Sequence, residues 1–294
     1  MPHDPGARGS HRRSRAIDVS AIVAVADGSG GMFATAGADG RISVRDASGG
    51  IVSAFDAPVA DESPVWSNRL AVVDVGAVHV VVGSWRRGVA AYTVDGRQVW
   101  HRRDVRQVQA VRPLPSGDGS SGWAGVVVES GPGLVLGPTG GTRHRLPGVR
   151  FLAGGPDGSV LVHDRRGLNR RPAPNQGPAW RADPGTFAVL DAVLDEVETL
   201  VCGADGRLSL FGAGGIPLWR TPDGSGRRIV RVCPDPAGPG WLCLAFPAAG
   251  GAEVLRAGRD GGLVPVGEVP LAAFGFAGGG RFVVATDGTI TPVA

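Results

Sequence analysis

Short runs of β-branched and aromatic residues, separated by glycine turns, extend along most of the chain. Two of them, VHVVVGSW (78–85) and GVAAYTVD (88–95), have the composition of strands rather than helices. The dipeptide Asp-Gly recurs between runs, and it suits tight hairpins because both positions tolerate a positive φ. The stretch 187–201 comes nearest to helical spacing, but its period-two pattern predicts two strands around the acidic turn Asp195-Glu196. The chain is therefore predicted to be all-β.

The strand pattern repeats along the chain. GADGRIS at 37–43 recurs as GADGRLS at 203–209, and ATDGTIT at 285–291 is a looser third copy. Their offsets of 166 and 82 residues are four and two steps of about 41 residues, so 294 residues hold about seven units. Four short strands in each unit are typical of a seven-bladed β-propeller with four-stranded antiparallel blades. The first strand of each unit is predicted to begin near Ser20, Leu70, Val108, Arg150, Phe187, Ile229 and Leu271.

The two ends of the chain are predicted to meet in one blade. The last unit reaches Ala294 after only three strands, and residues 15–20 can supply the missing outer strand. An N-terminal strand that joins the C-terminal blade closes the ring and removes exposed sheet edges. The predicted organisation is a disordered polar and basic tail at 1–14 followed by one propeller at 15–294.

Several units pair a glycine turn with an aromatic residue. YTVDGRQVW at 92–100 and LFGAGGIPLW at 210–219 are two copies, GPAW at 177–180 is a shorter one, and Phe55 takes the aromatic position in the first unit. In repeat shape the chain resembles the WD40-like and quinoprotein-like (PQQ-like) propeller families. The resemblance implies that the aromatic residues pack between neighbouring blades, which suits the large apolar area of an indole. The residues concerned are Phe55, Trp100, Trp180 and Trp219.

Composition narrows the classes of function. No run of about 20 apolar residues is present and no signal peptide is recognisable, so neither a membrane span nor export is expected. The odd number of cysteines, Cys202, Cys233 and Cys243, predicts small buried residues in a cytoplasmic protein rather than a disulfide framework. All 30 basic residues are arginine, and the net charge of +3 is too small to indicate nucleic-acid binding by itself.

In an antiparallel four-stranded blade, the turn between the second and third strands lies on the same face of the ring as the link to the next blade. Many arginines fall in these turns and links, so they are predicted to gather on one face. Arginine forks bind carboxylate and phosphate groups, so this rim is predicted to bind a partner. The alternative interpretation is that arginines of a lysine-free chain simply occupy solvated loops. The predicted rim consists of Trp85, Arg86, Arg87, His101, Arg102, Arg103, Arg106, Arg165, Arg166, Arg227 and Arg228. The opposite face is predicted to carry Asp191, Asp195, Glu196 and Glu198.

No catalytic constellation emerges from the sequence. The six histidines lack the spacing of a zinc site, no Gly-x-Ser-x-Gly elbow is present, and the glycine-rich loops lack the lysine of a P-loop. We therefore predict no catalytic residue, no metal and no cofactor. The first hypothesis is a non-enzymatic propeller that acts as a protein-interaction scaffold or recognition module, with a protein partner, an acidic one among the options, bound at the rim.

Two other functions stay open. The central channel can hold a small ligand or an active site, such as that of a quinoprotein-like oxidoreductase, a lyase or a lactonase. Asp74 and Asp191 are the carboxylates predicted on inner strands, although the remaining inner-strand residues are mostly apolar. The third hypothesis is a nucleic-acid sensor that uses the same arginines.

Overall fold

The computed structural model describes residues 22–26, 32–37, 41–46, 48–56, 69–74, 78–84, 86–114, 122–183, 188–222, 226–235, 238–269, 273–277, 281–286 and 289–293. These residues form 27 strands and one 3₁₀ turn, η3 (Ala213–Gly215). Within this described part, no helix is both long and apolar enough to cross a membrane. The all-β prediction is therefore confirmed.

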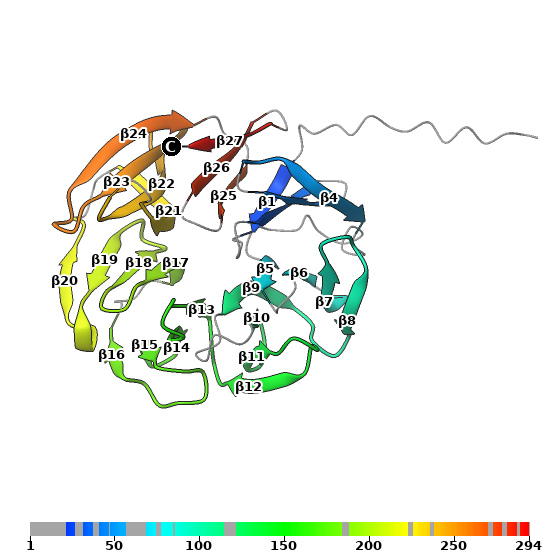
Figure 1. The fold of residues 1–294 in the computed structure, drawn as a ribbon. Coiled ribbons are helices and arrows are strands. Elements are labelled where there is room, and N and C mark those ends of the chain that lie inside the picture. The colour runs from blue at the N-terminus through cyan, green and yellow to red at the C-terminus, as the bar shows by residue number, and fades with distance from the viewer. Residues whose placement is uncertain are drawn as a thin grey trace, which may run out of the picture.

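The strands form seven antiparallel sheets arranged around a ring, six with four strands and one with three among the described residues (Figure 1). The first three sheets contain β1 (Ile22–Ala26), β2 (Phe33–Gly37), β3 (Arg41–Arg45) and β4 (Ile51–Asp56); β5 (Leu70–Asp74), β6 (Val78–Ser84), β7 (Gly88–Thr93) and β8 (Gln98–Arg102); and β9 (Val108–Leu114), β10 (Trp123–Val128), β11 (Gly133–Leu136) and β12 (Thr142–Leu146). The next two contain β13 (Phe151–Gly154), β14 (Val160–Asp164), β15 (Gly167–Arg171) and β16 (Trp180–Ala182); and β17 (Val189–Leu194), β18 (Thr199–Gly203), β19 (Leu208–Phe211) and β20 (Pro217–Arg220). The last two contain β21 (Arg227–Pro234), β22 (Trp241–Pro247), β23 (Ala252–Ala257) and β24 (Leu263–Val269); and β25 (Ala273–Ala277), β26 (Arg281–Thr286) and β27 (Thr289–Val293).

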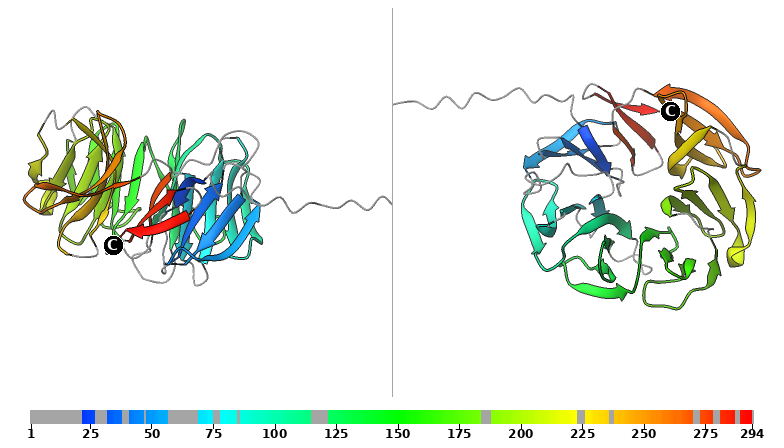
Figure 2. Two further views of the ribbon diagram at one scale, coloured as in Figure 1. Left: turned by 90° about the horizontal axis from the view of Figure 1, so that it is seen from above. Right: turned by 180° about the vertical axis from the view of Figure 1, so that it is seen from behind.

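Each sheet is one blade, and its strands follow one another in sequence order from the centre of the ring to its periphery (Figures 1 and 2). The predicted first strands at Leu70 and Val108 begin at those residues, and the other five begin within two residues of the predicted position. Residues 187–201 form β17 and β18, as the period-two pattern predicts. The predicted closing strand at 15–20 and the predicted tail at 1–14 lie outside the described residues, so both stay predictions.

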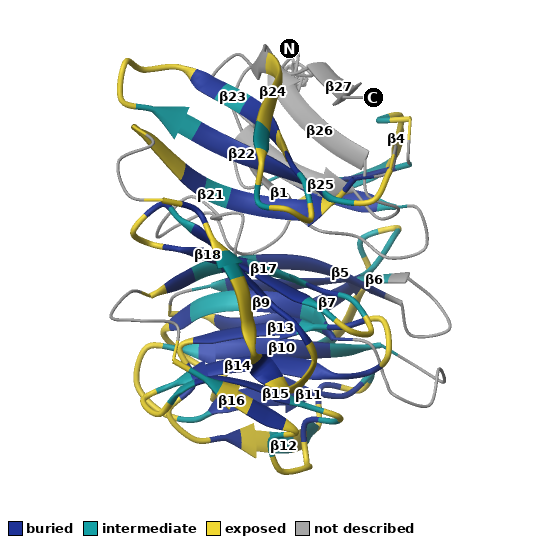
Figure 3. Ribbon diagram, turned by 90° about the vertical axis from the view of Figure 1, so that its left-hand side faces the viewer, coloured by how far each residue is buried: buried dark blue, intermediate teal, exposed yellow. Residues whose placement is uncertain are grey.

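The apolar core lies between blades rather than inside them. In the first such layer, Ile42 and Val44 of β3 pack with Leu70 and Val72 of β5 and with Val80 of β6, all at most 1% exposed. Similar layers join each later pair of four-stranded blades. A single sheet is too thin to bury both of its faces, so each blade depends on its neighbours (Figure 3).

A repeated contact joins the outer parts of neighbouring blades. An aromatic ring on the outermost strand of one blade lies against a glycine in the turn between the third and fourth strands of the next blade. All four glycines have a φ between 76° and 85°, a conformation that side chains with a Cβ rarely adopt. We call this the aromatic–glycine contact; its members are Phe55 with Gly96, Trp100 with Gly140, Trp180 with Gly215, and Trp219 with Gly261.

Hydrogen bonds fix two of these rings. The indole Nε1 of Trp100 donates to the carbonyl oxygen of Pro138 at 2.9 Å, and that of Trp219 donates to the carbonyl oxygen of Arg259 at 2.7 Å. Both acceptors belong to the same turns as the contacted glycines. The indoles therefore bury apolar area without leaving their N–H group unsatisfied.

Replacing Gly140 with alanine tests the aromatic–glycine contact. A Cβ at this position would lie 2.7 Å from Cδ2 of Trp100, and the backbone φ is 78°. We expect G140A to lose about 3 kcal/mol of unfolding free energy, from backbone strain and overpacking together. The control is G141A in the same turn, where the nearest atom is 3.8 Å away. It should change stability by less than about 0.5 kcal/mol in urea denaturation. Equal effects of the two variants would contradict the contact.

Candidate functional site

The predicted rim is dispersed over several blades. Arg86, Arg87, Arg165 and Arg166 are exposed in turns between the second and third strands of the second and fourth blades. Exposed Arg103 and Arg106 follow β8 in the link to the third blade, whereas Arg227 and Arg228 are the first two residues of β21. Trp85 lies outside the described residues. The rim therefore contains separate groups of arginines rather than one continuous cluster.

Several rim residues make contacts within the protein. The guanidinium of Arg102 donates to both carboxylate oxygens of Asp104, at 2.7 and 2.6 Å, and to the carbonyl oxygen of Gly140 in the third blade at 2.7 Å. His101 Nε2 donates to the carbonyl oxygen of Arg87 at 2.7 Å, and Arg227 pairs with Glu253. Arg102 in particular stabilises the junction between the second and third blades.

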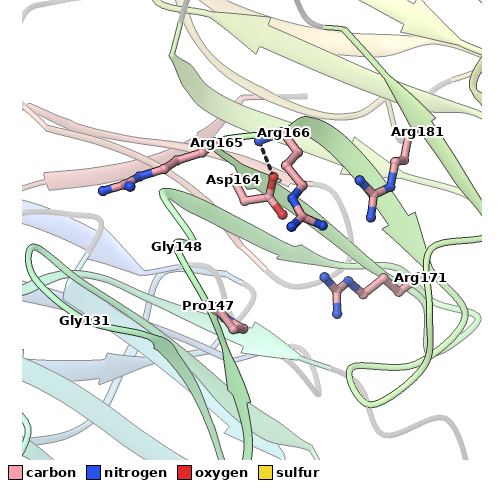
Figure 4. Close-up of a pocket in the computed structure, with 8 residues that line it drawn as sticks. All are labelled: Gly131, Pro147, Gly148, Asp164, Arg165, Arg166, Arg171 and Arg181. Carbon is pink, nitrogen blue, oxygen red and sulfur yellow. Dashed lines mark hydrogen bonds between the residues drawn. The ribbon is translucent and has the colours of Figure 1, made fainter.

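Arg165 and Arg166 border a hollow between the third and fourth blades (Figure 4). The hollow has a volume of about 560 Å³. The guanidinium groups of Arg166, Arg171 and Arg181 point toward a common space, while Arg165 extends to the other side of the turn (Figure 4). The third blade contributes backbone turns with little side chain, at Gly131, Pro147 and Gly148. Cationic groups of one blade therefore face a wall of the other blade that carries no charge.

Positive charge dominates this hollow. Its lining contains one carboxylate, Asp164, which accepts hydrogen bonds from the backbone N–H of Arg166 at 2.7 Å and from Nδ2 of Asn169 at 3.3 Å. Within the described part of the chain, no ion pair involves Arg165, Arg166, Arg171 or Arg181. Such guanidinium groups are available for charge-assisted hydrogen bonds to an anionic ligand.

A second hollow of about 710 Å³ lies beside β12, the outermost strand of the third blade. It is lined by all five residues of β12 and by Pro174 and Asn175, and it shares Arg171 with the first hollow. Arg143 and Arg145 are exposed on β12. We call the two hollows together the basic groove; its arginines are Arg143, Arg145, Arg165, Arg166, Arg171 and Arg181.

Sequence reasoning identified only part of this groove. Strand parity singled out Arg165 and Arg166, which lie in a turn, and missed four arginines on the outer strands and on β15. A signal for two of them was present in the alternation of Thr-Arg-His-Arg at 142–145, and both arginines are exposed, although a register shift with β11 leaves Arg143 without a paired residue.

The acidic face differs from its prediction. Asp195 and Glu198 lie in the turn after β17, where Arg259 pairs with them at 3.7 and 3.0 Å. Asp191 is not on that surface: it is 5% exposed and lies on the inner strand β17. The prediction that Asp191 lies on the opposite face is therefore wrong. Strand β17 continues past Asp191 to Leu194, and the turn begins only after Leu194.

Asp191 is the centre of a buried ion cluster on the inner strands. Its carboxylate lies 3.5 Å from Arg112 of β9 and 3.4 Å from Arg231 of β21, and it accepts a hydrogen bond from the backbone N–H of Val232 at 3.1 Å. Arg112 also lies over the ring of Phe151, 5.6 Å from its centroid. The cluster links the third, fourth, fifth and sixth blades around the axis. The side chain of Asp74, the other predicted inner carboxylate, lies outside the described residues.

The remaining candidates for chemistry are dispersed or buried. Among the described residues, no three His, Cys, Asp or Glu side chains are grouped closely enough to hold a metal ion. All three cysteines are buried thiols, and burial raises the pKa of Cys202 and of Cys243. A thiol with a raised pKa carries little of the nucleophilic thiolate at neutral pH.

Asp191→Asn tests the buried cluster. The substitution leaves two buried guanidinium groups beside a neutral amide, and breaking a buried ion pair from one side costs about 3 kcal/mol or more of unfolding free energy. The control is E196Q, a change at an exposed turn residue that should shift stability by less than about 0.5 kcal/mol. Urea denaturation of both variants decides the matter; a D191N protein as stable as E196Q would contradict a structural role for the cluster.

The Arg102–Asp104 pair predicts a pH dependence. Hydrogen bonds from Arg102 lower the pKa of Asp104 to about 2, although the carboxylate is 66% exposed. Because this folded-state pKa is below the unfolded value of about 3.9, the stabilisation is present above pH 4 and is lost as the pH falls toward 2. We expect R102Q to return the NMR titration midpoint of Asp104 toward 3.9. An unchanged midpoint would assign the low pKa to another cause.

No protein-family model matches this sequence, and no curated protein matches it. In three dimensions the chain is similar to the β-propeller domain of Cps50 (Swd1) from Myceliophteria thermophila, with a TM-score of 0.70 over 93% of this chain and 96% of that domain. The sequence identity is 14%, so the likeness shows the fold alone. The fold class is therefore a β-propeller, and function has to be argued from the site.

Proposed function

We propose that this protein is a non-enzymatic recognition module that binds an acidic protein partner at its arginine-bearing face. One observation carries the proposal: Arg165, Arg166, Arg171 and Arg181 line one hollow, and none of them belongs to an ion pair within the described chain. Other arginines, such as Arg102, make ion pairs within the fold. Arg171 donates one hydrogen bond within its strand, from Nε to Oδ1 of Asn169 at 3.0 Å, and the remaining guanidinium N–H groups support the binding of an anionic partner.

The rigidity of the ring supports the same interpretation. The groove arginines belong to turns and strands that also contain buried residues. On β15, for example, Leu168 and Asn169 are buried and precede Arg171. The planar guanidinium group of each arginine can form two parallel hydrogen bonds with a carboxylate of the partner. The three buried cysteines form no disulfide, which fits the reducing cytoplasm where we place the protein.

The two other hypotheses have weaker support. In the channel, the inner-strand charges Arg112, Asp191 and Arg231 contact one another and are at most 9% exposed, so they serve the fold. A nucleic-acid sensor uses the same groove cations, and it differs from an acidic protein by a steep dependence of affinity on salt. Salt titration of binding separates these two partners.

Charge reversal tests the proposed function. The probe is a fluorescein-labelled peptide of twelve glutamates, with binding followed by fluorescence anisotropy at 50 mM salt. We expect R165E/R166E to weaken binding at least tenfold, because each lost charge-assisted hydrogen bond is worth about 1.5 kcal/mol or more. Exposed Arg97, in a turn of the second blade away from the groove, provides the control variant R97E.

Two results would contradict the proposal. One is a wild-type protein that does not bind the acidic probe even at low salt. The other is an R165E/R166E variant that binds as tightly as R97E does.

A further inference from the structure

The aromatic–glycine contact is replaced at one junction between blades. Six four-stranded blades have five junctions, and the contact occurs at every one except that between the third and fourth blades. Trp100 and Trp219 each follow their own blade's turn glycine, Gly96 or Gly215, by four residues. The same offset from Gly140 leads to His144, whose ring instead lies against Trp123 of its own blade, at 5.7 Å between centroids. The outer strand of the third blade thus has no aromatic anchor in the fourth.

The fourth blade also departs from the repeat at this junction. In the five other four-stranded blades the third and fourth strands are joined by a tight turn with a positive-φ glycine, whereas here residues 172–179 form the connection. Pro174 and Asn175 of this connection face β12 across the second hollow. The basic groove therefore lies where both partners of the usual contact are absent.

β12 presents an open edge to this groove. It is the outermost strand of its sheet, and within the described chain it pairs with β11 alone. The side chains of Arg143 and Arg145 are exposed, while Leu146 is buried. Backbone groups on the outer edge of a sheet are ready to pair with another extended chain. The pairing of β12 with β11 has a register shift between Thr142 and His144, so the regular part of the edge is His144–Leu146, which extends over roughly 10 Å and matches about three residues of an added strand.

We propose that an extended acidic segment of the partner binds in the basic groove as an additional strand along β12. Backbone hydrogen bonds to the strand edge supply affinity, and acidic side chains on alternate positions meet Arg143, Arg145 and Arg171. The inference rests on the proposed function and adds to it the conformation of the bound segment and the strand that receives it. The site ends at Arg165 and Arg166, where the groove reaches the rim.

The lining of the groove favours a peptide over a nucleic acid. Proteins that bind single-stranded nucleic acid stack bases on exposed aromatic rings. Among the residues that line the two hollows, the one aromatic ring is His144, which is half-buried against Trp123. An extended peptide needs no such platform, because its backbone bonds to the strand.

The first arm of the experiment locates the site. The probe is a fluorescein-labelled peptide of six Glu-Thr repeats, and its affinity for the full chain is measured by anisotropy. We expect R143E/R145E to weaken binding at least tenfold. The matched control R97E/R220E makes the same change of charge at two exposed arginines that belong neither to the groove nor to the rim, and it should change affinity less than threefold. Equal losses in the two variants would overturn the assignment to β12, and thermal unfolding checks that each variant is folded.

The second arm tests strand pairing. Two further probes carry backbone N-methyl groups on every glutamate or on every threonine. Only one of these two sets of N–H groups faces β12 in a paired strand, so one probe should lose at least tenfold in affinity and the other should keep most of it. If both methylated probes bind like the parent peptide, strand pairing is overturned.

The outcomes separate this inference from the proposed function. If R165E/R166E weakens binding while R143E/R145E and N-methylation leave it unchanged, the added strand is overturned. The proposal of an acidic partner at the rim is then retained. A wild-type protein that binds neither acidic peptide overturns both. Binding of a twelve-residue oligothymidylate in place of the peptides also overturns both and assigns the groove to nucleic acid.

Discussion

The contact between an aromatic ring and a positive-φ glycine of the next blade governs how this propeller is assembled. Flat apolar layers between sheets supply most of the burial, but such layers alone permit blades to slide past one another. A ring that fits only where a Cβ is absent fixes one relative position, and indole hydrogen bonds in the cases of Trp100 and Trp219 fix its orientation. The contact thereby fixes the relative position of neighbouring blades at four of the five junctions between the four-stranded blades.

The basic groove lies at the one junction between the described four-stranded blades where the aromatic–glycine contact is absent. At the junction between the third and fourth blades, His144 and the long connection at 172–179 take the place of the contact, and the basic groove opens there. Elsewhere arginines serve the fold: Arg102 joins two blades through Asp104 and Gly140, and Arg170 is 6% exposed and bonded to Asp157 and Ser159. In contrast, the four arginines that line the first hollow belong to no ion pair in the described chain.

Sequence alone predicted the repeated four-stranded sheets and the places where they begin, because the 41-residue period and the glycine–aromatic spacing can be recognised without knowing which segments meet in space. The blade starts and the two strands of 187–201 follow from alternation of apolar and polar residues. The site was harder to foresee, because it depends on which strands meet across a junction. The order of strands in each blade correctly predicted that Arg165 and Arg166 lie in turns. It could not show that Arg143 and Arg181, which are far apart in sequence, border one groove. It also placed Asp191 at the surface, although the strand buries it.

Amide hydrogen exchange with and without the Glu-Thr peptide tests the central claim most directly. An added strand shields the outer backbone groups of the strand that it joins, so the account predicts slower exchange confined to residues 142–146 and to the facing connection at 172–179. Slower exchange at the channel strands instead, or no change at β12 under saturating peptide, would contradict it.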